Sequence, residues 1–356
     1  MSYKTVISAF VVAITSVTLI TSPLSVSAAG SSQSNARQSV NSLELVSARD
    51  NVLGSFTASQ SVYATKTYIY LASAQGTLFV LKRNQAENFP LVQSINIGSP
   101  LTGVLGFNNK LFVTSQDGYL REYSTTNPLT LKRTVQLSTY GLSSIAVINQ
   151  TVYVARGQAS LAVDNSNVYL AQLNEGDVAL ELNSKLQITK TYGQNFEADV
   201  TVIYNRANSN KVRAVSNPTT TNGSAGQPAL FTLNSNLIQT NPGCCGTGVL
   251  LTNTQTYSQT ALVNHPYANA VTAKKQSLLI GDEAGKVGLY RYSASSTQKL
   301  TELNLRELTG NNGSEDIEIR SIWIDGYDNL VFAASSWGND ESRSPELPSV
   351  FILEIK

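Results

Sequence analysis

The sequence predicts an all-β fold, a six-bladed β-propeller with seven blades as the alternative, closed by an N-terminal strand that completes the last blade. Three observations lead to this prediction. Six segments share one strand–turn–strand pattern, the last unit ends one strand short, and a strand-like segment near the N-terminus resembles the missing one. Residues 42–356 are also many for one ordinary core, whereas repeated units need to pack only on their neighbours.

The second strand of each unit carries the repeat. It is an apolar segment that ends in Ala, Thr or Gly before a polar turn. In the first three units these end residues are 42 and 41 positions apart, close to the roughly 40–45 residues of a propeller repeat. The later spacings of 59, 67 and 52 residues are interpreted as insertions. The six second strands are expected at 69–72, 111–114, 152–155, 211–214, 278–281 and 330–333.

Third strands are clearest after Gly76, Gly118 and Gly285, each of which follows a polar turn. A glycine there can take a positive φ without strain. In five units a fourth segment follows in which apolar and polar residues are mixed, as in a strand. These fourth strands are expected at 91–97, 131–137, 186–192, 237–240 and 300–305.

The last unit stops at residues 349–356 without a fourth strand, and residues 42–47 resemble the fourth-strand pattern. The N-terminal strand is therefore expected to complete the last blade and to leave no unpaired edge between the first and last blades. Leu43, Leu45 and Val46 should lie at the outer edge of the blade that contains Trp323 and Phe351. A β-sandwich or a solenoid is the alternative to a closed ring.

Three of the units, 68–81, 110–123 and 277–292, resemble WD-repeat and quinoprotein-type (PQQ-like) propeller repeats. The resemblance extends over nearly all of 43–356 and is at the level of the superfamily, so it implies the fold and says little about function. The Trp-Asp dipeptide that closes a WD repeat is absent from positions 121–123 and 288–290. The regular tryptophans of quinoprotein dehydrogenases are absent as well, because the chain has two Trp.

The first 29 residues have the pattern of a signal peptide. Lys4 precedes an apolar run at 9–20, and small residues at 27–29 suit cleavage. A membrane anchor is the alternative, but the run is shorter than the roughly 20 residues that a span needs. Residues 30–41 are expected to be a flexible arm and 42–356 the propeller domain of a secreted or periplasmic protein, with no membrane span in the mature chain.

The charge balance bears on the class of partner. The net charge is +1 and 14% of the residues are charged. Nucleic-acid binders carry a basic stripe, which this composition does not suggest. A protein or glycan partner is expected instead.

Long polar segments interrupt the repeat at 217–228, 241–268 and 335–348. They are expected on the face where the loops between second and third strands and the loops between blades lie, here called the top face. Long loops on a rigid scaffold often carry function, although they also arise by drift in length. The binding candidates on them are Trp337, Asp340, Glu341, Arg343, His265 and Tyr267.

Cys244 and Cys245 are adjacent, lie between two glycines and are the only cysteines. In an oxidising compartment they are expected to form a vicinal disulfide. Two free thiols, or a bond between two chains, are the alternatives. Some quinoprotein dehydrogenases contain such a disulfide, but two residues do not establish that resemblance. A metal site with His265 is not expected, since a closed site needs four ligands.

Catalysis is the second functional hypothesis. His265 is the only histidine, so any Ser-His-Asp or Cys-His mechanism would use it. Asp199 is the other catalytic candidate. Acidic residues gather near the expected starts of inner strands and in the neighbouring top loops, where they either hold calcium or are solvated charges. They are Glu197, Asp199, Glu315, Asp316, Glu318, Asp117, Asp282 and Glu283, of which Glu197, Asp199, Glu315 and Asp316 are the metal candidates.

These observations favour an exported propeller that acts as a binding module through its top-face loops. A calcium-dependent hydrolase or lactonase at the mouth of the central channel is the alternative. A quinoprotein-like redox protein is the third hypothesis.

Overall fold

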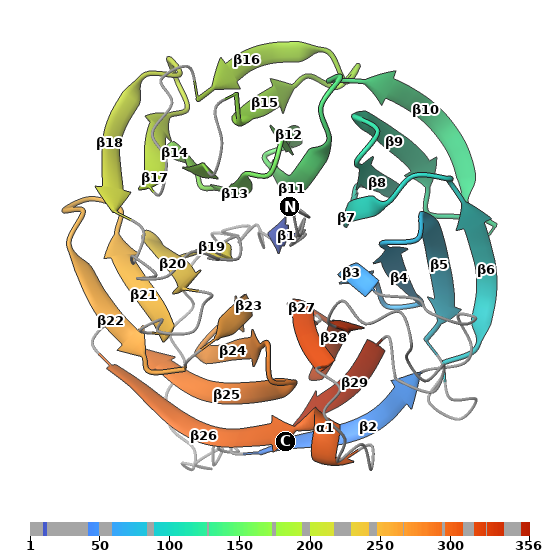
Figure 1. Ribbon diagram of the computed structural model, residues 1–356, viewed down its shortest axis with the longest axis vertical. Helices are drawn as coiled ribbons and strands as arrows, with labels where there is room; N and C mark the ends of the chain where they lie inside the picture. Colours follow the sequence, from blue (N-terminus) through green and yellow to red (C-terminus); the bar gives the residue numbers. More distant parts are fainter. Residues whose placement is uncertain are drawn as a thin grey trace, which may run out of the picture.

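The computed structural model has seven sheets, six of four strands and one of five, arranged side by side around a central axis (Figure 1). The fold is a seven-bladed β-propeller. The predicted fold class is therefore confirmed, the count of six blades is wrong, and the seven-blade alternative holds. The structure describes residues 10–12, 42–49, 59–83, 89–126, 128–172, 176–193, 200–216, 229–241, 248–265, 267–293, 296–308, 317–324, 326–337 and 350–356.

Four blades are built from strands that are consecutive in the chain and run from the axis to the rim (Figure 1). Blade one comprises β3 (Ser59–Ala64), β4 (Tyr68–Ser73), β5 (Thr77–Lys82) and β6 (Leu91–Asn96). Blade two comprises β7 (Leu101–Phe107), β8 (Lys110–Ser115), β9 (Tyr119–Ser124) and β10 (Thr130–Gln136). Blade five comprises β19 (Leu230–Leu233), β20 (Asn236–Asn241), β21 (Gly248–Asn253) and β22 (Gln259–Val263). Blade six comprises β23 (Ala268–Lys274), β24 (Ser277–Asp282), β25 (Lys286–Ser293) and β26 (Ser296–Asn304).

The small residue at the end of a second strand has a packing reason. Ala72, Thr114, Ala155 and Ala333 are fully buried. At the equivalent Gly281, an added Cβ would lie 2.4 Å from Ile319 in the inner strand of the next blade. The residue at the end of each second strand is therefore small because neighbouring blades approach one another closely there.

Blades three and four are interlocked. The chain forms the inner half of blade three with β11 (Leu142–Ile148) and β12 (Thr151–Arg156), then the inner half of blade four with β13 (Ser160–Val163) and β14 (Asn167–Gln172). It returns to blade three for β15 (Val178–Leu182) and β16 (Ile188–Tyr192), and then completes blade four with β17 (Val200–Asn205) and β18 (Lys211–Ser216). Along the chain, blade three is completed only after the inner half of blade four, and blade four only after blade three is complete.

The short crossover between β12 and β13 requires glycine at position 157. Gly157 has a φ of +84°, and a Cβ there would lie 1.9 Å from the Asp177 carboxylate. The same carboxylate accepts a hydrogen bond of 3.2 Å from the Gln158 backbone N–H. The two crossovers between the blades are thus held together where they pass.

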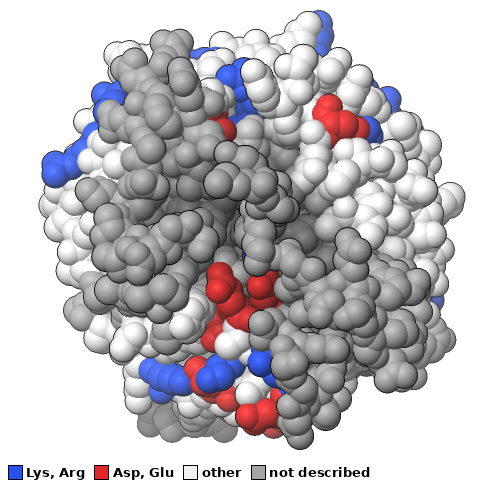
Figure 2. Space-filling model, viewed as in Figure 1, with Lys and Arg blue, Asp and Glu red and all other residues white. Residues whose placement is uncertain are grey.

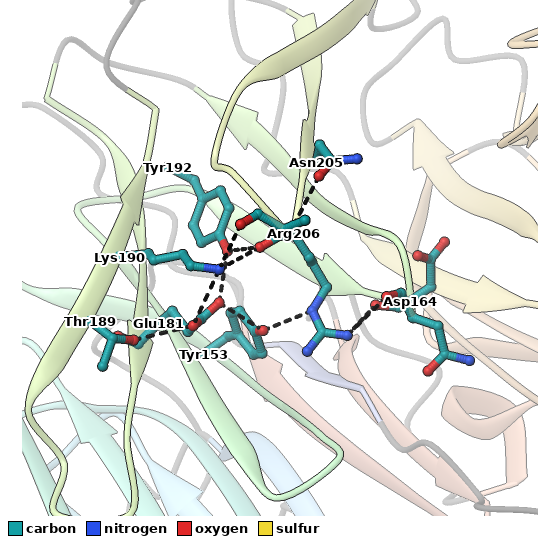
Figure 3. Close-up of polar contacts among 10 residues, drawn as sticks. Tyr153, Asp164, Glu181, Thr189, Lys190, Tyr192, Asn205 and Arg206 are labelled. Atoms are coloured by element: carbon teal, nitrogen blue, oxygen red, sulfur yellow. Dashed lines mark hydrogen bonds and ion pairs between the residues drawn. The ribbon is translucent and has the colours of Figure 1, made fainter.

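On the opposite face, here called the bottom face, polar side chains join the same two blades (Figure 3). Arg206, in the β17–β18 turn, donates from Nε to Tyr153 Oη at 2.8 Å and from Nη1 to the carbonyl oxygens of Asp164 and Asn165. Glu181 accepts from Tyr153 Oη at 3.0 Å and from Tyr192 Oη at 2.7 Å. Burial first, and Glu181 next, raise the pKa of Tyr192, so its hydroxyl remains a donor.

Blade seven combines both ends of the described chain. β27 (Ile317–Ile324), β28 (Leu330–Trp337) and β29 (Val350–Ile355) run from the axis outward, and β2 (Leu43–Arg49) pairs antiparallel with β29 at the rim. Leu43 faces Ile355 and Leu45 faces Leu353, with a bulge at Val46. Trp323 and Phe351 belong to the same sheet.

The count of six blades arose from the interlocked region. Residues 211–214 were predicted as a second strand but belong to β18, the outermost strand of blade four, where Ala214 is only partly buried. Residues 237–240 were predicted as a fourth strand but belong to β20, the second strand of blade five. The supposed insertion at 241–268 contains β21 and β22, the outer half of that blade.

Two short elements complete the described chain. β1 (Phe10–Val12), from the segment predicted to be a signal peptide, pairs in parallel with β11 inside the ring. α1 (Leu305–Leu308) lies between β26 and β27. Among the described residues, no helix has the length and apolar character needed to cross a bilayer.

Candidate binding face at the top of the ring

The top face, which Figure 2 presents to the viewer, has acidic side chains beside the centre of the ring, in the lower half of the view. Glu318 and Arg320 lie near the start of β27, and Glu283 lies in the β24–β25 turn of blade six. Arg320 forms an ion pair with Glu318. Blades six and seven therefore bring charges of both signs together at this point.

A β-bulge positions Arg320. The register of β27 against β28 shifts between Ile319 and Ser321, so Arg320 is the extra residue. Such a residue is left out of the ladder, and its side chain is re-aimed. Burial lowers the pKa of Arg320 to about 10, and the nearby Glu283 opposes that shift, so the guanidinium is still charged at neutral pH.

The same bulge recurs around the ring. The inner strands of blades one, two, three and six also shift register near their starts, at Gln60, Thr102, Ser143 and Asn269. Thr102 donates to Thr114 Oγ1 at 3.0 Å, and Ser143 donates to the Ala159 carbonyl oxygen at 2.6 Å. Polar residues thus mark the upper end of five inner strands, and Arg320 is the one that carries a charge.

His265 lies under this face, not on its surface. Its side chain is almost fully buried, with Nδ1 2.7 Å from Tyr290 Oη and Nε2 3.1 Å from Asp282 Oδ2. The other oxygen of Asp282 accepts from the backbone N–H groups of Ala284 and Lys286. His265 therefore joins the connection from blade five to the turn and third strand of blade six.

This arrangement is poorly suited to general-base catalysis. Both ring nitrogens of His265 already have protein partners, and the ring has little access to solvent. Burial first, then Glu302 and Asp282, raise the pKa of Tyr290, which keeps its hydroxyl protonated. A base must reach the proton it removes, and here the ring would first have to leave its partners.

Asp117 is likewise held by protein groups. Its carboxylate accepts from Ser115 Oγ at 2.5 Å, from Arg121 Nη2 at 2.6 Å and from the Tyr119 backbone N–H at 3.2 Å. Burial acts to raise the pKa of Asp117, but the Arg121 and Ser115 hydrogen bonds, the Tyr119 hydrogen bond and the Arg121 charge outweigh it and lower that pKa. A calcium ion at this carboxylate would have to displace Arg121.

The remaining candidates divide into two groups. Trp337 is the last residue of β28, paired with Ile317, so the first three residues of the predicted loop at 335–348 belong to the strand. Tyr267 has a φ of +63° and is partly exposed between blades five and six. The other candidates lie outside the described residues: Glu197, Asp199, Cys244, Cys245, Glu315, Asp316, Asp340, Glu341 and Arg343.

Within the described part of the chain, no group of three or more His, Cys, Asp or Glu side chains is arranged to hold a metal ion. Sequence reasoning singled out Asp282 and His265 separately, and it missed that they contact each other. It also missed Arg320 and Tyr290. Arg320 lies at the upper end of an inner strand, and Tyr290 lies within a third strand. A correct count of the blades would have drawn attention to both positions.

Comparison with known proteins supports the fold. Neither a protein-family model nor a curated protein is similar in sequence to this chain. A crystal structure of the computationally designed Ika8 protein matches it with a TM-score of 0.58 and 11% sequence identity, over 88% of this chain and 100% of that chain. Identity this low carries the shared fold and nothing about function.

Proposed function

We propose that the chain is an exported binding module that holds a protein or glycan partner on its top face, beside blades six and seven. The observation that carries this proposal is the largely buried, charged Arg320 at the start of β27, next to Glu318 and Glu283. Together these charges of both signs can form charge-assisted hydrogen bonds with polar groups of a partner. The chain between β28 and β29, which carries Asp340, Glu341 and Arg343, starts from the neighbouring strand.

The destination of the protein belongs to the same proposal. The pattern at residues 1–29 supports export to a secreted or periplasmic location, with cleavage near residue 29. Cleavage there would remove β1 and leave blade three with its four antiparallel strands. An oxidising compartment would then support the Cys244–Cys245 bond.

We also propose that β2 closes the ring. Its pairing with β29 joins the two ends of the described propeller within one sheet. A ring closed in this way has no unpaired edge where the first and last blades meet. The structural pairing supports this role, and its contribution to stability is testable.

The calcium-dependent hydrolase and the quinoprotein-like redox protein remain alternatives without support from the described residues. Asp117 is paired with Arg121, and Glu318 with Arg320, which leaves these carboxylates less suited to a cation. Calcium titration with a thermal-shift readout, and the absorbance spectrum of the purified protein, test the two alternatives directly.

The test of the binding proposal begins with the mature protein, residues 30–356, on a glycan array and in cross-linking capture from the source culture. Once a partner is known, Trp337→Ala and Arg343→Ala are each expected to weaken binding by about 2 kcal/mol or more. Asn149→Ala, in a bottom-face turn of blade three, is the control and should leave affinity unchanged. If Asn149→Ala abolishes binding and Trp337→Ala and Arg343→Ala do not, the site is wrongly assigned.

A further inference from the structure

The turns on the bottom face are rich in basic residues. This face is formed by the turns that join first to second strands and third to fourth strands within the blades. The basic residues of the described turns are Lys66, Arg83, Lys185, Arg206 and Lys275, and those of the strand ends that border a turn are Lys82, Lys110, Lys211 and Lys274. The acids at the same described positions are Asp164 and Asp328. The described part of the bottom face therefore carries an excess of positive charge.

Both of these acids are engaged by the protein. Asp328 forms an ion pair with Arg83, which comes from blade one. Asp164 accepts a hydrogen bond from the Tyr169 hydroxyl and, at 2.7 Å each, from two backbone N–H groups of its own turn. Each carboxylate thus has a local role, and the lysines elsewhere on the face remain in excess.

A carboxylate beneath the face is shared in the same way. Glu122 is buried, and it pairs with Lys110 at 3.2 Å and also with Arg133. One negative charge therefore serves two positive charges at blade two. The buried acid holds the two basic side chains in place and leaves a net positive charge there.

Four exposed lysines extend the positive charge across the face. Lys66 lies in the β3–β4 turn of blade one, and Lys185 lies in the β15–β16 turn of blade three. Lys211 begins β18 of blade four, and Lys275 lies in the β23–β24 turn of blade six. These blades lie on different sides of the central axis (Figure 1). The charge is thus spread over the whole face and is not confined to one groove.

The two faces of the ring differ in charge. The top face has acidic side chains beside its centre (Figure 2), whereas lysines predominate among the exposed charges of the described bottom turns. The net charge of +1 averages over this difference, which is why the composition gives no sign of it. A protein with charge separated in this way is oriented by an anionic surface, with its basic face toward that surface.

Tyr327 adds an aromatic ring to the same face. It lies in the β27–β28 turn of blade seven and is 70% exposed, the most exposed of the large hydrophobic side chains that the structure describes. A tyrosine has an apolar body and a polar tip, and tyrosines are enriched where the membrane meets water. The ring and the lysines together suit the headgroup region of a lipid bilayer.

We propose that the bottom face docks onto an anionic lipid surface, with its exposed lysines against the phosphate headgroups and Tyr327 at the interface. A plane can contact the turns of blades one, three, four and six at the same time, whereas a linear polyanion follows only neighbouring blades. Each lysine near such a surface strengthens binding about fivefold, so several weak contacts add up. This docking is independent of the top-face proposal and leaves that face open to a partner.

Vesicle sedimentation tests the proposal with the chain from residue 30 onward, which contains all four antiparallel strands of every blade. The protein should bind vesicles of phosphatidylglycerol and phosphatidylcholine but not vesicles of phosphatidylcholine alone, and salt should weaken the binding. Lys66→Gln and Lys275→Gln should each weaken it about fivefold, and the double variant about 25-fold. Lys286→Gln, which makes the same change at the top-face end of β25, is the matched control and should bind as the parent does.

The stability of the variants separates lost docking from unfolding. Lys66 and Lys275 are exposed, so their replacement should leave the melting temperature unchanged. Tyr327→Ala should also weaken vesicle binding without lowering that temperature. The proposal is overturned if anionic vesicles are not bound, if neutral vesicles bind equally well, if the double lysine variant binds as the parent does, or if soluble heparin binds and the vesicles do not. None of these results would bear on the top-face proposal, because its partner binds the opposite face.

Discussion

Leu43 and Ile355, from opposite ends of the described propeller, face each other across the outermost ladder of blade seven. Leu43 is 3% exposed and packs in a cluster that spans blades six and seven and includes Leu289 and Phe351. The N-terminal strand thus contributes to the core as well as to the sheet.

Removal of residues 42–48 is expected to lower the melting temperature sharply, because it exposes the edge of β29 and the apolar side chains beneath it. Leu43→Ala alone should lower the free energy of unfolding by about 2–5 kcal/mol, measured by urea denaturation. Val46→Ala is the matched control, since Val46 is 38% exposed at the bulge, and should change that free energy by no more than about 0.5 kcal/mol. A truncated protein that melts as the parent does would contradict closure by β2.

The contacts of His265 predict a structural effect of its removal. His265→Ala leaves Asp282 Oδ2 and Tyr290 Oη without this partner and opens a cavity, so the free energy of unfolding should fall by about 2–4 kcal/mol. Tyr267 is two residues further along the chain and partly exposed, so Tyr267→Ala should lower the free energy of unfolding by less. Asp282→Asn keeps the oxygen that caps the β24–β25 turn and should cost less than Asp282→Ala. Chemical denaturation of the four variants measures these differences; an unchanged stability of His265→Ala would contradict the assignment.

Arg206 is expected to stabilise the interlocked pair of blades. Arg206→Ala should lower the free energy of unfolding by about 2–3 kcal/mol, because charge-assisted hydrogen bonds to Tyr153, Asp164 and Asn165 are lost together. Arg206→Lys should recover only part of this, since an ammonium lacks the planar fork that reaches all three. Lys185→Ala, at an exposed position in a neighbouring bottom turn, is the control. Equal stability of the Lys and Arg proteins would show that charge alone matters here.

Asp117 predicts a pH dependence. Its pKa is lowered in the folded protein, so the unfolded chain takes up its proton first as the pH falls. The stabilisation from its contacts with Arg121 should be fully present above the unfolded-state pKa of about 3.9 and be lost as the pH falls through the folded-state pKa. The difference in urea midpoint between the parent and Asp117→Asn should therefore shrink at acidic pH. A difference that is constant across the titration would show that the charge of Asp117 contributes nothing.

Cys244 and Cys245 should be bonded to each other if the protein is exported as proposed. Their adjacency, the flanking glycines and the oxidising compartment that the proposed export implies favour this pairing. The intact mass after alkylation, with and without prior reduction, measures it. A double Cys244→Ser, Cys245→Ser variant is the control for the mass shift. Two alkylated thiols without reduction, or a reducible dimer, would contradict the intrachain bond.

The sequence determined the local structure well. Alternating apolar residues, polar turns and the glycines that open third strands predicted strands and hairpins that the structure contains. These signals depend on backbone conformation and on neighbours a few residues away. A strand at 42–47 was also predicted, because this segment resembles the fourth strands and the last unit lacks one; the structure has β2 there.

Only the tertiary structure decided which sheet each strand joins. The segment Val168-Tyr169-Leu170-Ala171 repeats the second-strand pattern of residues 152–155, but it follows too soon to mark a separate unit in a regular repeat. The interlocked topology assigns it to blade four. The contacts of His265 and of Arg320 likewise depend on how strands and whole blades pack. Pairing within a hairpin is local, whereas the choice of a sheet and the meeting of side chains from different blades are set by long-range packing that no short pattern encodes.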